Sequence, residues 1–194
     1  MSRLSYFLSV TAVLFILSQF FMAYRFSKTE SPNYTVIKKY EDFELRQYES
    51  MVVAQTVMKN KSFVSSSEEG LKTVSGYIDG NNSQNKKIAM TTPVIMEIGE
   101  KNKMALVMPK EHALENLPKP NSNKVEIIKV LPKKYAVLTF PGYTDDKKIE
   151  RYSKKLLKYV RNEGFQTIGN VHFMGYSDPW QVIGRKNEVA IEIR

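Results

Sequence analysis

The chain has few side chains that could act as catalysts, and their spacing matches no standard catalytic site. It has no cysteine, which excludes disulfides, cysteine-ligated zinc, iron–sulfur clusters and thiol nucleophiles. The two histidines, His112 and His172, have no further zinc ligands at a suitable spacing. Neither a Gly-x-Ser-x-Gly nucleophile motif nor a glycine-rich phosphate loop occurs. The sequence therefore predicts a binding protein and not an enzyme.

Methionine is the residue type that best indicates a binding surface. The chain has nine methionines, and a flexible thioether adapts well to an apolar ligand. Six of them lie in or beside predicted strands: Met58, Met90, Met96, Met104, Met108 and Met174. Ordinary core packing is the alternative interpretation for each of them.

The net charge of +9 points to no particular anionic partner. Lysines are scattered through strands, turns and the second predicted helix, as on a solvated surface. No nucleic-acid-binding motif accompanies them, so we expect no nucleic-acid partner.

The N-terminal segment is predicted to lie outside the folded domain. Residues 4–24 are uncharged and mostly apolar, between Arg3 and Arg25, which is the length needed to cross a bilayer core of about 30 Å. A cleaved signal peptide is the alternative, although it would be shorter and end in small residues, whereas this segment ends Phe-Phe-Met-Ala-Tyr. We expect a transmembrane anchor or signal segment (1–26), a linker (27–32) and one domain (33–194). The domain is expected to be extracytoplasmic, in a periplasm or a lumen.

Two helices and several strands are predicted within the domain. Apolar residues at helical spacing predict helices at 62–79 and 145–162, with Gly80 and Gly164 as stops and Thr144 able to cap the second. β-prone runs predict strands at 34–40, 43–48, 51–58, 124–131 and 135–140, and a hairpin at 95–108.

The same layout is predicted twice. Pro93 leads into the first hairpin, and Asp178-Pro179 is predicted to lead into a second hairpin that ends at residues 187–191. An offset of about 85 residues also matches the strand and helix before each hairpin. One domain of two pseudo-repeated halves is expected.

Several motifs together resemble the SOUL haem-binding proteins. They are residues 40–48 (Tyr-Glu-Asp-Phe-Glu-Leu-Arg-Gln-Tyr), residues 88–94 (Ile-Ala-Met-Thr-Thr-Pro-Val), Phe165, Gly175-Tyr176 with Asp178-Pro179, and residues 184–189. The resemblance covers residues 33–194. It implies an α+β fold, in which a distorted antiparallel β-barrel-like sheet of two related halves is flanked by two helices. It also implies haem or a related tetrapyrrole as ligand.

The resemblance further implies an apolar groove beside the first helix of the domain. This groove would use Phe63, Val64, Leu71, Val74 and Ile78, with the loop 176–186 opposite. Arg185 or Lys186 would then meet a propionate through a charge-assisted hydrogen bond.

One position departs from the family. Some relatives have a histidine, the suggested iron ligand, where this chain has Gln47 between Arg46 and Tyr48. Glutamine is a poor haem ligand. His172 is the candidate replacement, with a methionine or tyrosine, metal-free apolar binding, or a different ligand as alternatives. A purely structural role is the other interpretation of His172.

Overall fold

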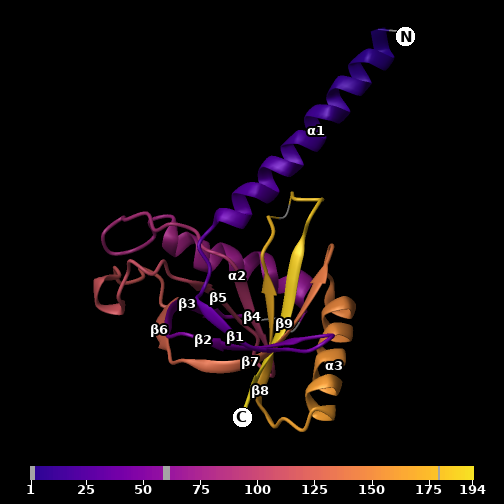
Figure 1. The fold of residues 1–194 in the computed structure, drawn as a ribbon. Coiled ribbons are helices and arrows are strands. Elements are labelled where there is room, and N and C mark those ends of the chain that lie inside the picture. Colours follow the sequence, from indigo (N-terminus) through magenta and orange to yellow (C-terminus); the bar gives the residue numbers. More distant parts are fainter. Residues whose placement is uncertain (1–2, 59–61, 179) are drawn as a thin grey trace.

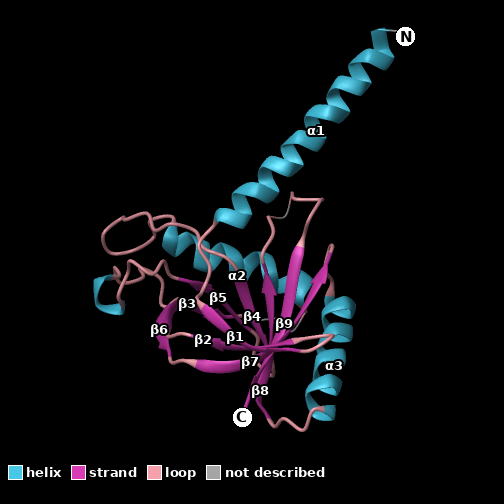
Figure 2. Cartoon of the chain, in the orientation of Figure 1, coloured by secondary structure: helices cyan, strands magenta, loops and turns pink. Residues whose placement is uncertain are grey.

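The computed structural model describes residues 3–58, 62–178 and 180–194, apart from the side chains of residues 26, 27 and 63–66. This part of the chain forms an antiparallel sheet, curled into a half barrel, and three α-helices (Figures 1 and 2). The predicted α+β class is confirmed. The helices are α1 (Arg3–Lys28), α2 (Phe63–Ile78) and α3 (Asp146–Asn162). The strands are β1 (Tyr34–Lys39), β2 (Glu44–Tyr48), β3 (Met51–Val57), β4 (Val94–Ile98), β5 (Lys103–Val107), β6 (Glu126–Val130), β7 (Lys133–Pro141), β8 (Thr167–Gly175) and β9 (Lys186–Ile193).

The strand order in the sheet is β1-β2-β7-β9-β8-β4-β5-β3-β6. Helix α2 contacts β5 and β3, while α3 contacts β9, β7 and β8. Because successive strand residues point to opposite faces, alternate side chains of these strands join the helices in one hydrophobic core, among them Leu106, Leu138 and Ile191. Both helices therefore cover the same face of the sheet, and its other face stays free of them.

Helix α3 forms where its amphipathic pattern predicts. Its buried side chains, Ile149, Leu156 and Val160, share one face at spacings of seven and four residues. Asp145, not the predicted Thr144, caps the start: its carboxylate accepts a hydrogen bond of 2.7 Å from the backbone of Lys148. Gly164 ends the helix with a φ of +79°, which glycine adopts without a steric penalty.

Helix α2 lies unusually close to the sheet at Gly70. A Cβ atom at this buried position would lie 3.0 Å from Sδ of Met58 and 3.2 Å from Sδ of Met104. Glycine lowers intrinsic helix stability by about 1 kcal/mol relative to alanine. Close packing of two methionine side chains against the helix backbone accounts for its presence.

The second hairpin begins earlier than the sequence predicts. Strand β8 ends at Gly175, so Asp178 lies in the loop after this strand and does not lead into the hairpin; residue 179 is outside the described residues. Sequence patterns missed β8 because Gly169 and Asn170 interrupt it. The pairing of β8 with β9 shifts register between Ile168 and His172, and Gly169 has a φ of +66° there.

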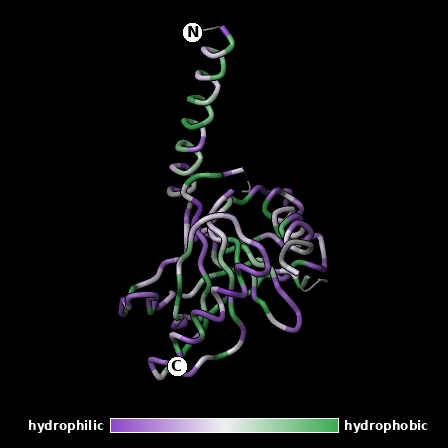
Figure 3. Tube along the Cα trace, turned by 90° about the vertical axis from the view of Figure 1, so that its right-hand side faces the viewer, coloured by the Kyte–Doolittle hydropathy of each residue, from purple (hydrophilic) through white to green (hydrophobic). Residues whose placement is uncertain are grey.

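Helix α1 projects away from the rest of the molecule and is apolar along most of its length (Figures 1 and 3). Its segment Arg3–Arg25 has the length and composition of a membrane span, and only 6% of its most hydrophobic window is buried. A signal sequence near the N-terminus can also meet these criteria of length and composition.

Candidate functional site

The sheet face that α2 and α3 leave uncovered holds a cavity of about 350 Å³. Side chains at alternate positions line it, such as Ile95 and Glu97 on β4 and His172 and Met174 on β8. Strands β7 and β6, which lie far apart in the strand order, both contribute to its wall. The cavity therefore occupies the concave side of the half barrel, and its volume is in the range of small-molecule sites.

The cavity walls combine apolar and aromatic side chains with two ion pairs. The rings of Tyr48 and Tyr135 meet edge to face, with centroids 5.7 Å apart. The apolar remainder of the wall includes Met51, Val53, Ile95, Ala105, Ile128, Val130, Ile168 and Met174. Lys103 Nζ lies 3.7 Å from a Glu97 carboxylate oxygen, and Lys133 Nζ lies 2.6 Å from one of Glu192. The charges of these side chains are thus balanced on a surface that is mostly apolar and also includes Gln55 and Asn170.

His172 is the side chain in this cavity best suited to bind a metal. Its ring lies against that of Tyr135, with centroids 5.5 Å apart. Burial lowers the pKa of His172 below its usual value, against an opposing effect of the Glu97 carboxylate. The imidazole is therefore uncharged at neutral pH and has a nitrogen lone pair. No hydrogen bond to this ring is found among the residues that the structure describes.

A buried ion pair fixes the sheet beside the cavity. Arg46 Nη1 on β2 donates hydrogen bonds of 3.0 and 3.1 Å to the two carboxylate oxygens of Glu188 on β9. The hydroxyl of Tyr176 donates one of 2.7 Å to the same carboxylate. Although burial alone would raise the pKa of Glu188, Arg46 and Lys186 hold it below its usual value. Burial and the nearby Glu188 carboxylate raise the pKa of Tyr48 to about 12, so this ring in the cavity wall stays neutral.

The structure places the predicted groove residues of α2 away from this cavity. Val74 and Ile78 are buried in the core between α2 and the sheet, and Leu71 packs against the same core. The side chains of Phe63 and Val64 lie outside the described set. Among the residues whose side chains the structure describes, none from α2 lines the cavity that contains His172.

The two predicted propionate partners already have partners of their own. Arg185 Nη1 donates to the backbone oxygens of Asp178 and Gln181, at 2.8 and 2.6 Å. Lys186 Nζ lies 3.0 Å from the Glu188 carboxylate and lines a separate pocket at the base of α1. The structure thus brings neither residue to His172.

Gln47 and His112 also lie away from the cavity. Tyr48 faces the cavity, so its neighbour Gln47 points to the opposite face of β2, where its amide donates to the Tyr48 backbone oxygen. His112 lines another pocket, with its Nε2 3.5 Å from Glu111. The signal that could have identified the cavity is the alternation Val171-His172-Phe173-Met174, in which Phe173 joins the core and its two neighbours face the cavity.

The segment between α1 and β1 runs along the cavity edge. Pro32 lines the cavity together with Pro93, which follows a cis peptide bond. The Thr92 backbone N–H donates to the backbone oxygen of Glu30 at 2.8 Å, and the Ser31 and Thr92 hydroxyls are 3.1 Å apart. These contacts attach the predicted linker to the motif at residues 88–94.

Comparison with known proteins relates most of the chain to one family. The family described as "SOUL heme-binding protein" matches residues 29–192. "Heme-binding protein 2" of Mus musculus is 26% identical over 156 residues, covering 76% of each chain. "Heme-binding protein 1" of Xenopus laevis is 25% identical and covers 76% of this chain and 81% of its own.

A solved structure has the same fold at much lower identity. The C-terminal domain of EcmrR aligns with a TM-score of 0.61 and 9% identity, covering 83% of this chain and 98% of that domain. An identity this low relates the two proteins by fold alone.

Proposed function

Because the chain belongs to the SOUL heme-binding protein family, we propose that it binds haem or a related tetrapyrrole in the concave cavity. The observation that carries this proposal is the uncharged imidazole of His172 in an apolar wall. Haem iron takes an axial ligand from an imidazole or a thioether, and bound haem would bring this metal centre to the site. His172 is the proposed ligand, and Met174 lines the same wall two residues away.

The side chains that line the cavity suit such a ligand. Tyr48, Tyr135 and the aliphatic side chains offer broad apolar contact to a macrocycle. Lys103 and Lys133 provide positive charge for carboxylates. A propionate would compete with Glu97 and Glu192 for these lysines, and the pair of Lys103 with Glu97 is the more open of the two at 3.7 Å.

We propose that the protein holds or carries the tetrapyrrole without a catalytic step. Within the described residues, no group of three or more metal-ligating side chains occurs. The roles that we assign to the site residues are iron ligation by His172 and contact with the macrocycle by Tyr48 and Tyr135.

We also propose that α1 anchors the domain in a membrane, with the domain on the extracytoplasmic side. The uncharged stretch of 21 residues supports a span in place of a shorter signal peptide. Because Pro32, in the short segment between α1 and β1, lines the cavity, the anchor would hold the cavity close to the membrane surface.

The proposal of two related halves is retained, but the elements are matched differently from the sequence-based expectation. β4 now corresponds to β8 and β5 to β9. Without β1, the strand order is symmetric: it reads the same from either end when β2 is exchanged with β6, β3 with β7, β4 with β8, and β5 with β9. Each strand of the first half therefore has a counterpart in the second half. Superposing residues 44–107 on residues 126–193 tests it: β4 should fall on β8 and α2 on α3, and a mismatch of these elements would overturn it.

A hemin titration followed by absorbance tests the proposed function. A saturable one-to-one change with a sharp Soret band for hemin, and weaker binding of a metal-free porphyrin, is expected. Equal binding of both would overturn iron ligation and leave an apolar site that ignores the metal. No saturable binding of either would overturn the haem proposal.

A second candidate is a small-molecule sensor or partner-binding module of the same fold that binds no haem. Gln47 favours it, since this position holds an amide where some relatives are suggested to supply an iron ligand. Saturable binding of an apolar small molecule, with hemin unable to displace it, would favour this candidate.

A further inference from the structure

The loop between β8 and β9, residues 176–185, exposes an unusual group of large apolar side chains. Trp180 is 80% exposed, Val182 48% and Ile183 41%. Single exposed apolar residues are common on soluble proteins, but a contiguous group with an exposed tryptophan marks a contact surface. The question is what covers this surface.

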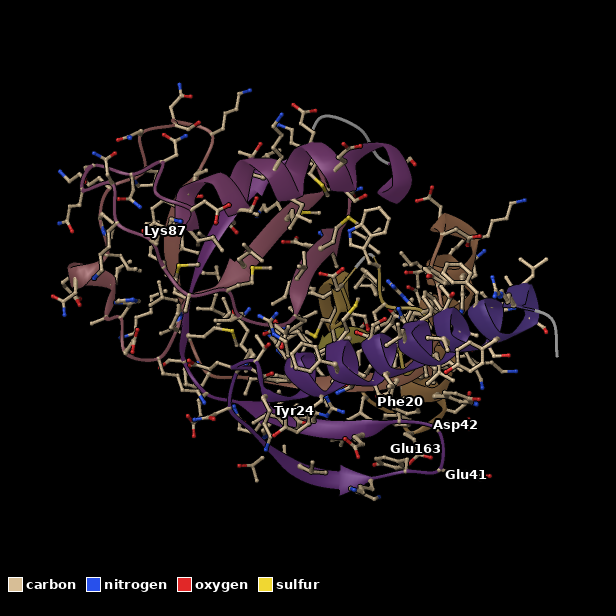
Figure 4. The ribbon with its side chains drawn as sticks, turned by 90° about the horizontal axis from the view of Figure 1, so that it is seen from above. Phe20, Tyr24, Glu41, Asp42, Lys87 and Glu163 are labelled. Carbon is tan, nitrogen blue, oxygen red and sulfur yellow. The ribbon has the colours of Figure 1, made fainter. Side chains whose placement is uncertain are left out.

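The loop lies against the base of α1. The Val182 backbone N–H donates a hydrogen bond of 2.7 Å to Oε1 of Gln19. A side chain at Gly184 would lie 4.0 Å from Cβ of Ala23. Gln19 is only 3% exposed, while its neighbours on α1, Phe20 and Phe21, are 60% and 62% exposed. In Figures 1 and 3 the loop rises beside the lower end of the helix, and Figure 4 shows Phe20 on α1 near that end.

The contact lies within the part of α1 that would cross a membrane. At 1.5 Å per residue, the 21 uncharged residues span about 31 Å, which matches a hydrocarbon core of about 30 Å. Gln19 precedes Arg25, the first charged residue after the span, by six residues, or about 9 Å along the axis. Segments that lie in a membrane interface are buried about 5–10 Å deep. The loop is therefore at interfacial depth if α1 spans.

Several polar groups of the loop have hydrogen-bond partners within the protein, whereas the buried Gln181 Oε1 has none among the described residues. Asp178 accepts hydrogen bonds from the backbone N–H groups of Trp180 and Gln181, through its side chain and its backbone oxygen respectively. The Gln181 side chain donates to the backbone oxygen of Ile183, and Gln19 accepts from Val182. Backbone groups that leave water need such partners, since lipid offers none.

The side chains around the loop match the composition of an interfacial belt. Tyrosine and tryptophan collect at the level of lipid headgroups, with basic residues beside them. Trp180 and Tyr143 are exposed here, and the Arg185 guanidinium lies 4.3 Å from the centre of the Tyr143 ring. At the base of α1, Tyr24 is exposed and followed by Arg25.

We propose that the β8–β9 loop inserts Trp180, Val182 and Ile183 into the lipid interface beside α1. The inference rests on the proposed membrane anchor and adds a second membrane contact to it. Two contacts fix the orientation of the domain, whereas one helix would leave the domain free to swing. The partner is the bilayer itself, and a second copy of the chain is the competing occupant.

The experiment uses Trp180 as the probe, since it is the single tryptophan of the chain. The full chain is reconstituted in phosphatidylcholine vesicles, with or without lipids brominated near the headgroup end of the acyl chain. Insertion predicts a blue-shifted emission, quenching of at least half the fluorescence by bromolipid, and several-fold protection from aqueous iodide. Red emission with iodide quenching like that of free tryptophan would overturn the proposal. Blue emission without bromolipid quenching would overturn it in favour of a protein partner.

A matched control moves the tryptophan to the turn between β6 and β7. Leu131, between β6 and β7, is 66% exposed, so the double variant Trp180→Phe, Leu131→Trp should remain open to iodide and insensitive to bromolipid. Co-flotation of the chain with the vesicles after carbonate washing tests the anchor separately. A chain that floats while Trp180 stays exposed contradicts the loop proposal alone, whereas a chain that fails to float contradicts the anchor and with it the insertion.

Discussion

Glu97 on β4 and His172 on β8 are register partners in the antiparallel sheet, and both side chains line the concave cavity. The carboxylate favours the protonated imidazole, but burial has the larger effect and keeps His172 neutral. The pair therefore places a potential metal ligand beside a negative charge in an apolar wall.

Replacing this ligand should change the haem spectrum. His172→Ala is expected to shift or broaden the Soret band of a hemin complex and to weaken binding by about tenfold or more, about 1.4 kcal/mol, because an axial ligand is lost. Absorbance titrations of both proteins measure this. His112→Ala is the matched control, since His112 lies in a different pocket. If the His172→Ala spectrum matches that of the unmodified protein, His172 is not the ligand.

Hemin affinity should depend on pH through His172. Because the pKa of the folded imidazole is below its ordinary value of about 6.5, the ring stays neutral from pH 8 to about 6.5 and affinity should be constant there. Below this range, protonation of the ring competes with iron and affinity should fall. The charged groups Glu97, Glu192, Lys103 and Lys133 also affect the pKa of His172.

The same lowered pKa affects folding. The unfolded chain binds the proton more readily, so His172 lowers stability as pH falls from about 6.5 toward the folded pKa.

A hemin titration series at pH 8, 7, 6 and 5, with His172→Ala in parallel, measures how hemin affinity depends on pH. An identical pH profile in the variant would assign the dependence to another group.

Breaking the buried ion pair should strongly destabilise the domain. Glu188→Gln leaves the buried Arg46 guanidinium paired with the partly exposed Glu44 carboxylate, and breaking a buried pair typically costs about 3–5 kcal/mol in the free energy of unfolding. Urea unfolding measures the loss. Glu150→Gln removes an exposed helix pair with Lys154 and should change stability by at most about 0.5 kcal/mol. Equal effects of the two variants would contradict the structural role assigned to Glu188.

Removing α1 should release a soluble domain, and the cut position should matter. A chain of residues 29–194 keeps the hydrogen bonds of Glu30 to the Thr92 and Lys110 backbones, whereas a chain of residues 32–194 loses them. We expect the longer chain to be more stable by about 1–2 kcal/mol. Thermal unfolding of the two chains compares them. An insoluble product from both would show that α1 is part of the folded core.

The sequence alone determined the features that depend on local periodicity. The helical spacing of Leu71, Val74 and Ile78 and the stop at Gly80 predict α2 within one residue at each end. The amphipathic pattern of residues 145–162 predicts the ends of α3 equally closely. The uncharged stretch before Arg25 predicts α1 because an apolar run of this length is typical of a membrane-spanning helix. Motifs read in order along the chain also indicated the family.

Only the tertiary structure decided which residues share a cavity. His172, Tyr48 and Tyr135 lie on strands that are distant in the sequence, and strand order and register bring them to one face. A shift of one residue along β8 would turn His172 toward the core, and the bulge after Ile168 that sets this register leaves no periodic signal in the sequence. The contact of Val182 with Gln19, 163 residues apart, likewise follows from how the chain folds back and not from any local pattern.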